Sequence, residues 1–568
     1  MSKFPINQRE LMTDIRELVE RSADLYAEKD AFLELNHSSE PVSVSYKTLL
    51  SDIRIVGTAL LSKGYAQKRI ALIGENSYAW VLGYLSIINS GMTVVPIDKE
   101  LSSSEITDQV ERAHVDAICC TDLYKPETEE VIERLYASNN RLIEMIELGT
   151  LASGSLAKKL FELGEEEVSR GNCLFDQVEL DRSATCCIMF TSGTTGKSKG
   201  VQLSHTNLAV NIKGSMEMVT YTTEDVFVSV LPIHHSFESM AGILCPVYHG
   251  STIGFCPSIK AMSKCFEVFQ PTALCLVPLH VETFQNKILR SVKDKYGEKT
   301  HDRILEPDAY ETQSNNELTD ILRPFADAAF GGRLSLIVAG GAPVAPSQTS
   351  FYKLLDIDLV QGYGVTECSP VVASNQNGHP IDNSVGIVAS CGEVKIGEEG
   401  QIMVKGASVM KGYLDDEENS FIDGWFPTGD LGYFKDGNLY ITGRCSDVIV
   451  MSSGKNIMPQ EIEQRLTSFS SIAEAVVIDG LSKGNGVEFL VAHICPDYDF
   501  FDSTPSNKDD TSYIQARVLA DVRSLNQDTP PFKRIFGVVI HEKPLEKTTT
   551  RKIKRFLLKG KTEGMIHV

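Results

Sequence analysis

The chain has 568 residues, of which 42% are hydrophobic and 23% are charged, and its formal net charge is −22. This composition is ordinary for a soluble globular protein, and a chain of this length can bury a large core without disulfides. No apolar run reaches the roughly 18 residues of a membrane-spanning helix. The acidic balance disfavours binding to nucleic acid or to anionic membranes.

The 13 cysteines indicate a reducing compartment. Two pairs are adjacent, several lie inside apolar runs, and neither a C-x-x-C motif nor a zinc-type spacing occurs. We therefore expect reduced, mostly buried thiols. The polar N-terminal segment "MSKFPINQRELMTDIRELVERS" does not resemble a signal peptide, so we expect a cytoplasmic protein. The sequence does not indicate an oligomeric state.

The first clear elements lie in residues 68–98, "KRIALIGENSYAWVLGYLSIINSGMTVVPID". This stretch predicts a strand, a helix over residues 78–89 and a second strand. Further along the chain, buried strands are predicted at "VDAICC", "ATCCIMF", "VFVSVLP", "TALCLVP" and "LSLIVAGG". Helical patterns between such strands favour an α/β fold with largely parallel sheets.

Two polar stretches, at about residues 295–317 and 496–512, are predicted to be loops or insertions. Residues 425–447 are β-rich with a turn at "KDGN", and "PQEIEQRLTSF" predicts a helix with proline near its start. We place a domain boundary there, with a large domain at 1–443, a hinge at 444–447 and a small domain at 448–568. From residue 533 onward the chain has ten Lys or Arg and three Glu, which favours either an anionic ligand or a solvated helix face.

The loop "TSGTTGKSKG" at residues 191–200 contains Gly-Lys-Ser, as a P-loop does. A P-loop would need glycine at position 191, which is Thr191. The loop follows a predicted strand directly, and strand ends are where open α/β sheets bind ligands. Glycines, hydroxyl groups and two lysines suit a phosphate site, although a plain exposed turn has the same composition.

Four further motifs follow in order: "AGGAP" (339–343), "QGYGVTE" (361–367), "TGDLG" with "GRCSD" (428–447) and "LEKTTTRKIKR" (545–555). Together with the loop at 191–200 they resemble the adenylate-forming superfamily of acyl-CoA synthetases, adenylation domains and firefly luciferase. The resemblance spans roughly residues 45–556. It implies a large N-terminal domain of parallel-sheet α/β subdomains with a small β-barrel-like part, and then a small mobile α+β domain.

The resemblance also implies an ATP site. By resemblance, the 191–200 loop wraps the β- and γ-phosphates of ATP, and Tyr363 stacks on the adenine. Asp430 binds the ribose hydroxyls, and Arg444 lies near the ribose at the hinge. Its ATP-binding residues are Thr191, Ser192, Gly193, Thr194, Thr195, Gly196, Lys199, Gly340, Gly341, Ala342, Pro343, Gln361, Gly362, Tyr363, Gly364, Thr366, Asp430, Arg444 and Lys552.

Catalysis is expected to rest on Lys552, Glu367 and Thr366. By resemblance, Lys552 bridges the carboxylate and the α-phosphate, and Thr366 contacts the α-phosphate. Glu367 would hold Mg²⁺ with Thr191 as a possible second ligand, and oxygen ligands suit this cation. Two anions must react, so positive charge is needed, whereas an ionised carboxylate needs no general base.

Three positions depart from the pattern of the superfamily. Ser198 replaces a proline that would stiffen the phosphate loop, so we expect a more mobile loop. Ser446 replaces the usual Asp or Lys of the hinge, and Arg551 replaces the glycine before Lys552. None of these changes forbids activity.

The acid is predicted to be a medium- or long-chain fatty acid. "LPIHHSFESMAGILCPVYHG" (231–250) resembles the acyl-pocket helix, with His235 beside the substrate carboxylate and an apolar continuation. Gly454 would lie near the pantetheine channel. The sequence most resembles bacterial-type long-chain fatty acyl-CoA synthetases, which implies an AMP-forming acid–thiol ligase that uses ATP, Mg²⁺ and CoA.

Several alternatives stay open. The thiol could belong to the phosphopantetheine of an acyl carrier protein, and the acid could be an aryl or natural-product acid. A P-loop NTPase is disfavoured by the missing glycine. A non-catalytic binding module is disfavoured because Glu367, Asp430, Arg444 and Lys552 are all present.

Overall fold

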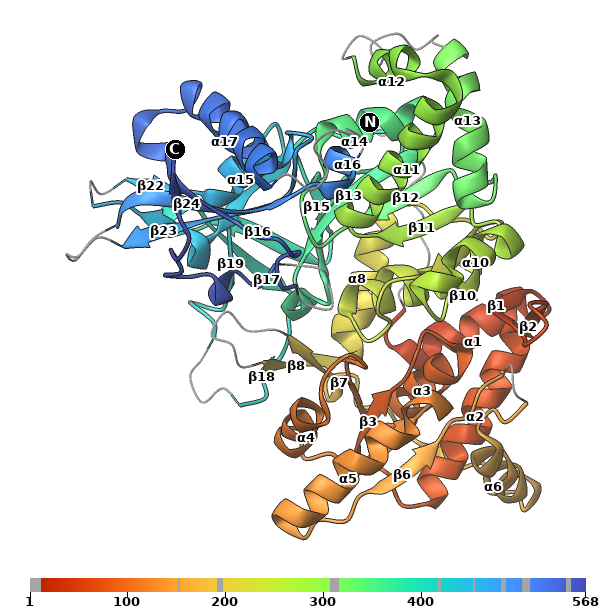
Figure 1. Ribbon diagram of the computed structural model, residues 1–568. Coiled ribbons are helices and arrows are strands. Elements are labelled where there is room, and N and C mark those ends of the chain that lie inside the picture. The colour runs from red at the N-terminus through yellow and green to blue at the C-terminus, as the bar shows by residue number, and fades with distance from the viewer. Residues whose placement is uncertain are drawn as a thin grey trace.

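The computed structural model describes residues 12–151, 154–191, 198–306, 316–415, 420–452, 455–481, 487–502, 511–547 and 553–568. Figure 1 shows the N-terminal sheet with its helices at the lower right, a second sheet above it and the C-terminal elements at the upper left. No described helix is long and apolar enough to cross a membrane.

The first sheet has seven strands in the order β18-β8-β7-β4-β3-β5-β6. Its central strands are parallel, whereas β8 pairs antiparallel with both β7 and β18. The strands are β3 (Arg69–Ile73), β4 (Thr93–Pro96), β5 (Ala117–Cys120), β6 (Glu144–Glu147), β7 (Thr185–Thr191), β8 (Lys199–Ser204) and β18 (Gly412–Tyr413). Helices of this region are α2 (Tyr46–Ser62), α3 (Tyr78–Asn89), α4 (Ser103–Arg112), α5 (Lys125–Asn139), α6 (Lys158–Ser169) and α7 (Leu174–Gln177).

The second sheet has nine strands in the order β15-β14-β13-β12-β11-β9-β10-β1-β2. The run from β13 to β1 is parallel, and both edges are antiparallel. The strands are β1 (Asp30–Leu35), β2 (Pro41–Ser45), β9 (Val226–Ser229), β10 (Thr252–Phe255), β11 (Ala273–Leu276), β12 (Leu336–Ala339), β13 (Asp358–Gly364), β14 (Val371–Ser374) and β15 (Ile387–Val388). Its helices are α1 (Ile15–Tyr26), α8 (His205–Met218), α9 (Cys245–His249), α10 (Met262–Phe269), α11 (Pro278–Tyr296), α12 (Glu298–Leu305), α13 (Asn316–Phe330) and α14 (Pro346–Leu354).

Three hydrophobic cores explain why the sequences of these strands are continuous apolar runs. One core joins the two sheets and contains side chains of α1, α2, α3 and α8. Two others cover the outer faces, one with α4 and α5 and one with α10, α11, α13 and α14. Strands buried on both faces alternate neither in burial nor in polarity, and helix α3 is buried over its full length. The predicted α/β fold is confirmed.

The predicted β-rich part is a four-stranded antiparallel sheet. It consists of β16 (Gly392–Ile396), β17 (Gln401–Gly406), β19 (Phe426–Lys435) and β20 (Asn438–Arg444). The turn between β19 and β20 falls at Asp436 and Gly437, where "KDGN" predicts it, and both residues have positive φ.

The C-terminal elements have a core of their own. A four-stranded sheet in the order β23-β24-β25-β26 has one parallel pair, β24 with β25. The elements are β21 (Ile449–Val450), β22 (Asn456–Ile457), α15 (Pro459–Thr467), β23 (Ile472–Leu481), β24 (Val487–Pro496), α16 (Tyr498–Asp502), α17 (Thr511–Gln527), β25 (Ile535–Ile540) and β26 (Ile566–His567). The helix predicted at "PQEIEQRLTSF" is confirmed as α15.

The prediction of loops at 295–317 and 496–512 is wrong in part. Helix α12 occupies Glu298–Leu305, and the short helix α16 occupies Tyr498–Asp502. In α12, Ile304 is the only buried residue and most of the eight residues are polar, which is why the sequence predicts a polar loop here. Residues 307–315 and 503–510 lie outside the described part of the chain.

Candidate active site

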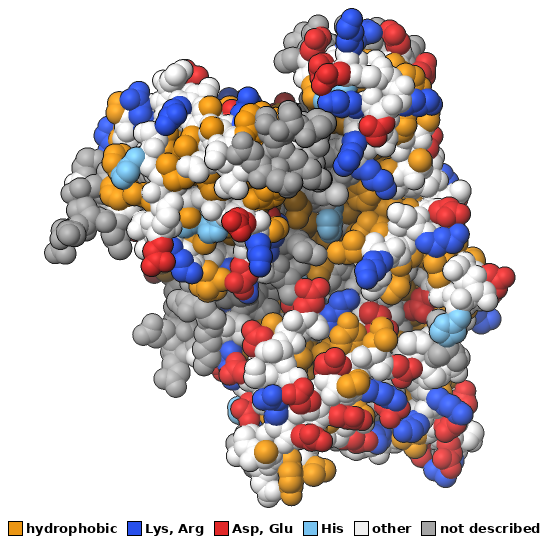
Figure 2. Space-filling model, in the orientation of Figure 1, with side chains coloured by type: hydrophobic (Ala, Val, Ile, Leu, Met, Phe, Trp, Pro, Cys, Tyr) orange, Lys and Arg blue, Asp and Glu red, His pale blue; other side chains and the backbone are white. Residues whose placement is uncertain are grey.

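A cavity of about 1410 Å³ lies where strands of both sheets end. Its wall includes Thr191 at the end of β7, Gly340 directly after β12 and Gly364 at the end of β13. C-terminal elements contribute to the same wall through Glu474, Lys554 and neighbours. In Figure 2 the surface is hollowed between the lobe at the upper left and the lobes on the right. Carboxyl ends of parallel strands are the usual ligand sites of such sheets.

Asp430 of β19 is the centre of a polar cluster at this cavity. Its carboxylate is 7% exposed and accepts a hydrogen bond from the Tyr363 hydroxyl at 2.8 Å. The Arg444 Nε lies 3.1 Å from the other carboxylate oxygen. Burial, reinforced by the charge of Asp430, raises the pKa of Tyr363 well above its usual value, so the hydroxyl remains a donor. Each carboxylate oxygen keeps a free lone pair for a further donor such as a ligand hydroxyl.

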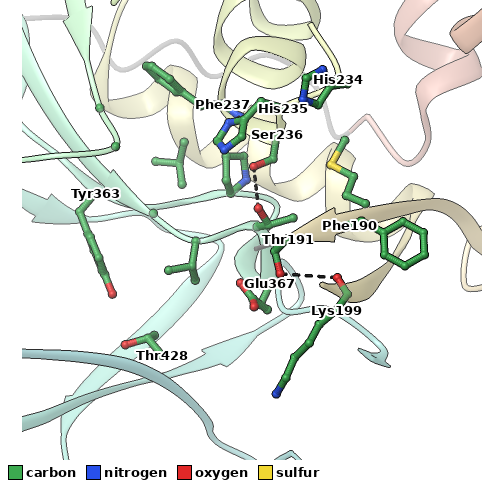
Figure 3. A pocket seen from close by; sticks show the side chains of 18 of the residues that line it. Phe190, Thr191, Lys199, His234, His235, Ser236, Phe237, Tyr363, Glu367 and Thr428 are labelled. Atoms are coloured by element: carbon green, nitrogen blue, oxygen red, sulfur yellow. Dashed lines mark hydrogen bonds between the residues drawn. The ribbon is translucent and has the colours of Figure 1, made fainter. Parts of the chain in front are cut away.

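Tyr413 of β18 contacts both an acidic and a basic side chain. Its hydroxyl donates to the Glu367 Oε1 at 2.8 Å, and the Lys199 Nζ lies 4.6 Å from the centre of its ring. The Thr191 hydroxyl donates to the Lys199 carbonyl at 3.5 Å, across the β7–β8 pair. Figure 3 shows Thr191, Glu367 and Lys199 on neighbouring elements at one end of the cavity. A carboxylate, an ammonium and hydroxyl groups at one place suit a phosphate ligand and a hard cation.

The connection from β7 runs into strand β8, not into a helix. Lys199 pairs with Thr191, and Gly200 pairs with Phe190. A P-loop leads from a strand into a helix, whose N-terminus binds the phosphates. The strand after this loop therefore argues against the P-loop alternative independently of the missing glycine.

Residues 234–237 form the next part of the wall. The hydroxyl groups of Ser236 and Thr366 are 3.0 Å apart, and Phe237 N–H donates to the His235 Nδ1 at 3.3 Å. Figure 3 shows Ser236 above Thr191 and Glu367, with His235 beside it. The Phe237 ring approaches Gly340 so closely that a Cβ there would lie 3.1 Å from it. Any larger residue at 340 would push this ring aside.

One part of the cavity is apolar and buried. A π-helix, Glu238–Leu244, follows residues 234–237 and continues into α9. Single π-helical turns are frequent at functional sites. The apolar wall is formed by residues from α8, the segment directly after it, the π-helix, α9 and β12, each of which is at most 6% exposed: Met216, Met218, Val219, Tyr221, Ala241, Cys245 and Val338.

The C-terminal part of the wall is the base of a chain reversal. Lys547 and Ile553 form an antiparallel bridge, and Glu474 of β23 binds this base by accepting from the Leu545 N–H at 2.7 Å and from the Lys547 Nζ. On the other arm, Arg555 donates to both carboxylate oxygens of Glu463, at 2.6 and 2.7 Å. Both arms are thus fixed to the C-terminal core. Residue 552, between them, lies outside the described residues.

Two family models cover most of the chain. The model of AMP-binding enzymes matches residues 19–414, and the model of the AMP-binding enzyme C-terminal domain matches residues 446–565. The chain belongs to the AMP-binding enzyme family. Similar curated proteins include "Long-chain-fatty-acid--CoA ligase 1" of Homo sapiens, 26% identical over 557 residues, which is 88% of this chain and 77% of that protein. "Long-chain-fatty-acid--CoA ligase FadD15" of Mycobacterium tuberculosis is 27% identical over 496 residues, or 83% and 80% of the two chains.

Solved structures of AMP-binding enzymes share the fold. ATP-bound MatB from Rhodopseudomonas palustris has a TM-score of 0.73 at 20% identity, over 97% of this chain and 99% of that one. The anthranilate CoA ligase AuaEII in complex with anthranoyl-AMP has a TM-score of 0.73 at 17% identity, over 98% of both chains. At such identities the likeness concerns the fold.

The structure gathers most of the described site residues that the sequence predicts. Those in the cavity wall are Thr191, Lys199, His235, Gly340, Gly341, Gly362, Tyr363, Gly364, Thr366, Glu367 and Arg444. Asp430 binds two of them, whereas Gln361, Ala342 and Pro343 do not form part of the wall. Ser192, Gly193, Thr194, Thr195, Gly196, Gly454 and Lys552 lie outside the described residues. The individual roles assigned to these residues remain predictions.

Three residues that contact the site were not predicted from the sequence. Tyr413 links Glu367 to Lys199, Ser236 binds Thr366, and Arg112 binds the residue before Lys199. "KGYL" at 411–414 is a weak turn-like signal for Tyr413. Ser236 and Arg112 lie 130 and 86 positions from the residues that they contact, and no local pattern reveals them.

Proposed function

We propose that this AMP-binding enzyme activates a medium- or long-chain fatty acid with ATP to an acyl-adenylate and then transfers the acyl group to the thiol of CoA. One observation carries the proposal: a single cavity joins a charged end around Lys199, Glu367 and Asp430 to a buried apolar wall. Such a cavity suits a reaction between a nucleotide and a long apolar acid. The names of the curated relatives support this choice.

ATP would bind along the polar wall. Asp430 has lone pairs free for the ribose hydroxyls, and the Tyr363 ring offers a face for adenine. Lys199 and the hydroxyl of Thr191 would meet the phosphates, together with the loop residues Ser192–Gly196. Gly341 has φ of +85° in the segment expected beside the adenine, so a side chain there would strain the backbone.

The donor set fits Mg²⁺. Glu367 and Thr191 offer one carboxylate and one hydroxyl, and no cluster of three or more His, Cys, Asp or Glu suitable for a metal occurs among the described residues. Mg²⁺ usually takes one or two protein oxygens and completes its shell with substrate phosphates and water. When bound, it would neutralise phosphate charge, and Glu367 and Thr191 would hold it.

The fatty acid would lie with its carboxylate near His235 and its chain along the apolar wall. The seven residues named above for this wall all have uncharged side chains. Burying a chain of methylene groups there contributes about 0.8 kcal/mol for each group.

In the first step, a carboxylate oxygen of the acid bonds to the α-phosphorus, and the bond from that phosphorus to the bridging oxygen breaks. Pyrophosphate leaves with the bonding electrons. The carboxylate is already ionised at neutral pH, so this step needs positive charge and not a base. Lys552 would supply the charge between the carboxylate and the α-phosphate, and the Thr366 hydroxyl would donate to the α-phosphate.

In the second step, the thiol sulfur bonds to the acyl carbon, and the bond to the phosphate oxygen breaks. AMP leaves, and the thiol proton passes to solvent. We infer that the unit 448–568 rotates about residues 444–447 between the steps, so that Gly454 replaces Lys552 at the cavity. Motions of this kind let one site serve two transition states.

A panel of acids tests the proposal. Purified protein is given ATP, Mg²⁺ and saturated fatty acids of increasing chain length, or aryl acids, with no thiol, with CoA or with a phosphopantetheine-bearing carrier protein. We expect AMP and pyrophosphate with medium or long fatty acids and acyl-CoA when CoA is present. Release of ADP, a requirement for aryl acids, or transfer to the carrier protein alone would contradict it.

A further inference from the structure

Arg112, the last residue of α4, holds the segment that carries Lys199. Its Nη2 donates to the Ser198 carbonyl at 2.8 Å, and its Nη1 lies 3.3 Å from the Ser198 hydroxyl. The same guanidinium donates from Nε to Asp415 at 2.8 Å and pairs with Asp108 of its own helix at 3.2 Å. Its carbon lies 5.3 Å from the centre of the Phe190 ring.

These contacts join three parts of the chain that are remote in sequence. Ser198 precedes β8, Asp415 follows β18, and the Arg112 side chain between them is only 14% exposed. A guanidinium presents its donors in one rigid plane, so contacts in several directions fix all partners at once. The N-terminus of α4 is itself fixed by a capping box between Ser102 and Glu105.

The segment fixed by Arg112 leads directly to the charged end of the cavity. Lys199 follows Ser198, and its ammonium lies over the Tyr413 ring, whose hydroxyl binds Glu367. Leu414 N–H donates to the Gly200 carbonyl at 2.7 Å, so both strands around Lys199 are tied together. A displacement of Ser198 would therefore move the ammonium of Lys199 relative to Glu367.

Arg112 itself does not form the wall of the cavity, although Asp108 and Gln109 of the same helix do. Its guanidinium is committed to Ser198, Asp415 and Asp108. An effect of Arg112 on ATP would therefore pass through Ser198 and Lys199.

We propose that Arg112 is a positioning residue that fixes Ser198 and Lys199 for ATP, and that it thereby replaces the stiffening of a proline at position 198. The inference rests on the proposed function, because it takes the polar end of this cavity as the ATP site.

The experiment compares variants of the full chain by calorimetric titration with ATP and Mg²⁺ and by acid-dependent pyrophosphate exchange. The variants are Arg112→Ala, Arg112→Lys, Ser198→Pro and the double variant with Arg112→Ala and Ser198→Pro. Arg134→Ala is the matched control, because Arg134 is an exposed arginine in an i,i+4 pair with Glu130 on the next helix. Thermal melting monitors folding of each variant.

We expect Arg112→Ala to raise the Kd and the KM for ATP about ten-fold, the size of a charge-assisted contact of about 1.4 kcal/mol. Arg112→Lys should resemble Arg112→Ala, because an ammonium cannot bridge the Ser198 carbonyl and Asp415 in one plane. Arg134→Ala should stay within two-fold of wild type, and Ser198→Pro provides the reference value for the double variant. The double variant should recover most of the loss, because proline fixes φ at position 198.

Three results would overturn the inference: Arg112→Ala that binds ATP as wild type does, Arg112→Lys that restores full binding through charge alone, or a double variant no better than Arg112→Ala. The titration contains no acid. It therefore tests Arg112 even if no fatty acid supports pyrophosphate exchange, and that second result would instead contradict the proposed function.

Discussion

Replacing Glu34 by Gln should stabilise the protein in alkaline but not in acidic solution. Glu34 of β1 is 7% exposed, and its carboxylate accepts from the backbone N–H of Tyr78 at the start of α3. Burial, with a smaller contribution from nearby Glu75, raises the pKa of Glu34 from 4.5 to about 7. Folding therefore removes the Glu34 carboxyl group from most of its contact with water and favours its protonated form.

The sign and the size of the effect follow from this shift. Because the folded-state pKa is the higher one, the stability that Glu34 contributes is fully present below pH 4.5 and is lost as pH rises to about 7. A difference of roughly 2.5 pKa units corresponds to about 3 kcal/mol. Glu34→Gln keeps an acceptor for the Tyr78 N–H but cannot ionise, so its gain over wild type should grow from near zero to about this value.

Urea unfolding at about pH 5 and about pH 8 measures the gain as a difference in the free energy of unfolding. The matched control is Glu133→Gln on the exposed face of α5, which should show no such change between the two pH values. If the free energies of unfolding of Glu34→Gln and wild type differ by the same amount at both pH values, the reasoning is refuted. The folded protein would then not favour the neutral form of the Glu34 carboxyl group.

Three further substitutions test the proposed chemistry. Lys552→Ala should lower acid-dependent pyrophosphate exchange about a hundred-fold or more while ATP binding survives, and exchange near the wild-type rate would remove Lys552 from the mechanism. Glu367→Ala should raise the Mg²⁺ concentration for half-maximal turnover about ten-fold, and an unchanged metal titration would exclude it as a ligand. Glu474→Ala should slow adenylation about ten-fold without weakening ATP binding, because it removes the acceptor of both Leu545 and Lys547 at the base of the segment that carries residue 552. A parallel loss of ATP binding would mean that Glu474 acts more broadly.

The fold was largely predictable because its strands are buried on both faces. Runs such as "CCIMF" and "LSLIVA" stand out in any window, and the helix over 78–89 was predicted with its bounds. Helix α12 was not, since its eight residues are mostly polar and only one of them, an isoleucine, is buried. A local sequence pattern therefore predicts a helix or a strand when the side chains of that segment are themselves part of the hydrophobic core.

The site was predictable only through the order of its motifs. Nothing local in the sequence ties Tyr363 to Asp430, which are 67 positions apart, or Arg112 to Asp415, which are 303 apart. The first pair could be expected because both residues belong to motifs of the family. The second could not, because it depends on where α4 ends relative to a two-residue strand, and tertiary packing alone determines that.

The short strand β18 has a consequence for synthesis of the chain. It lies beside β8 at the edge of a sheet whose other strands all come from residues 69–204. Until residues 412–413 have left the ribosome, one edge of β8 in the β7–β8 pair has no partner strand. Open edges invite pairing with other chains. Nascent or truncated chains that stop short of β18 should therefore aggregate through β8 more readily than the full-length protein, however well the rest of that sheet has folded.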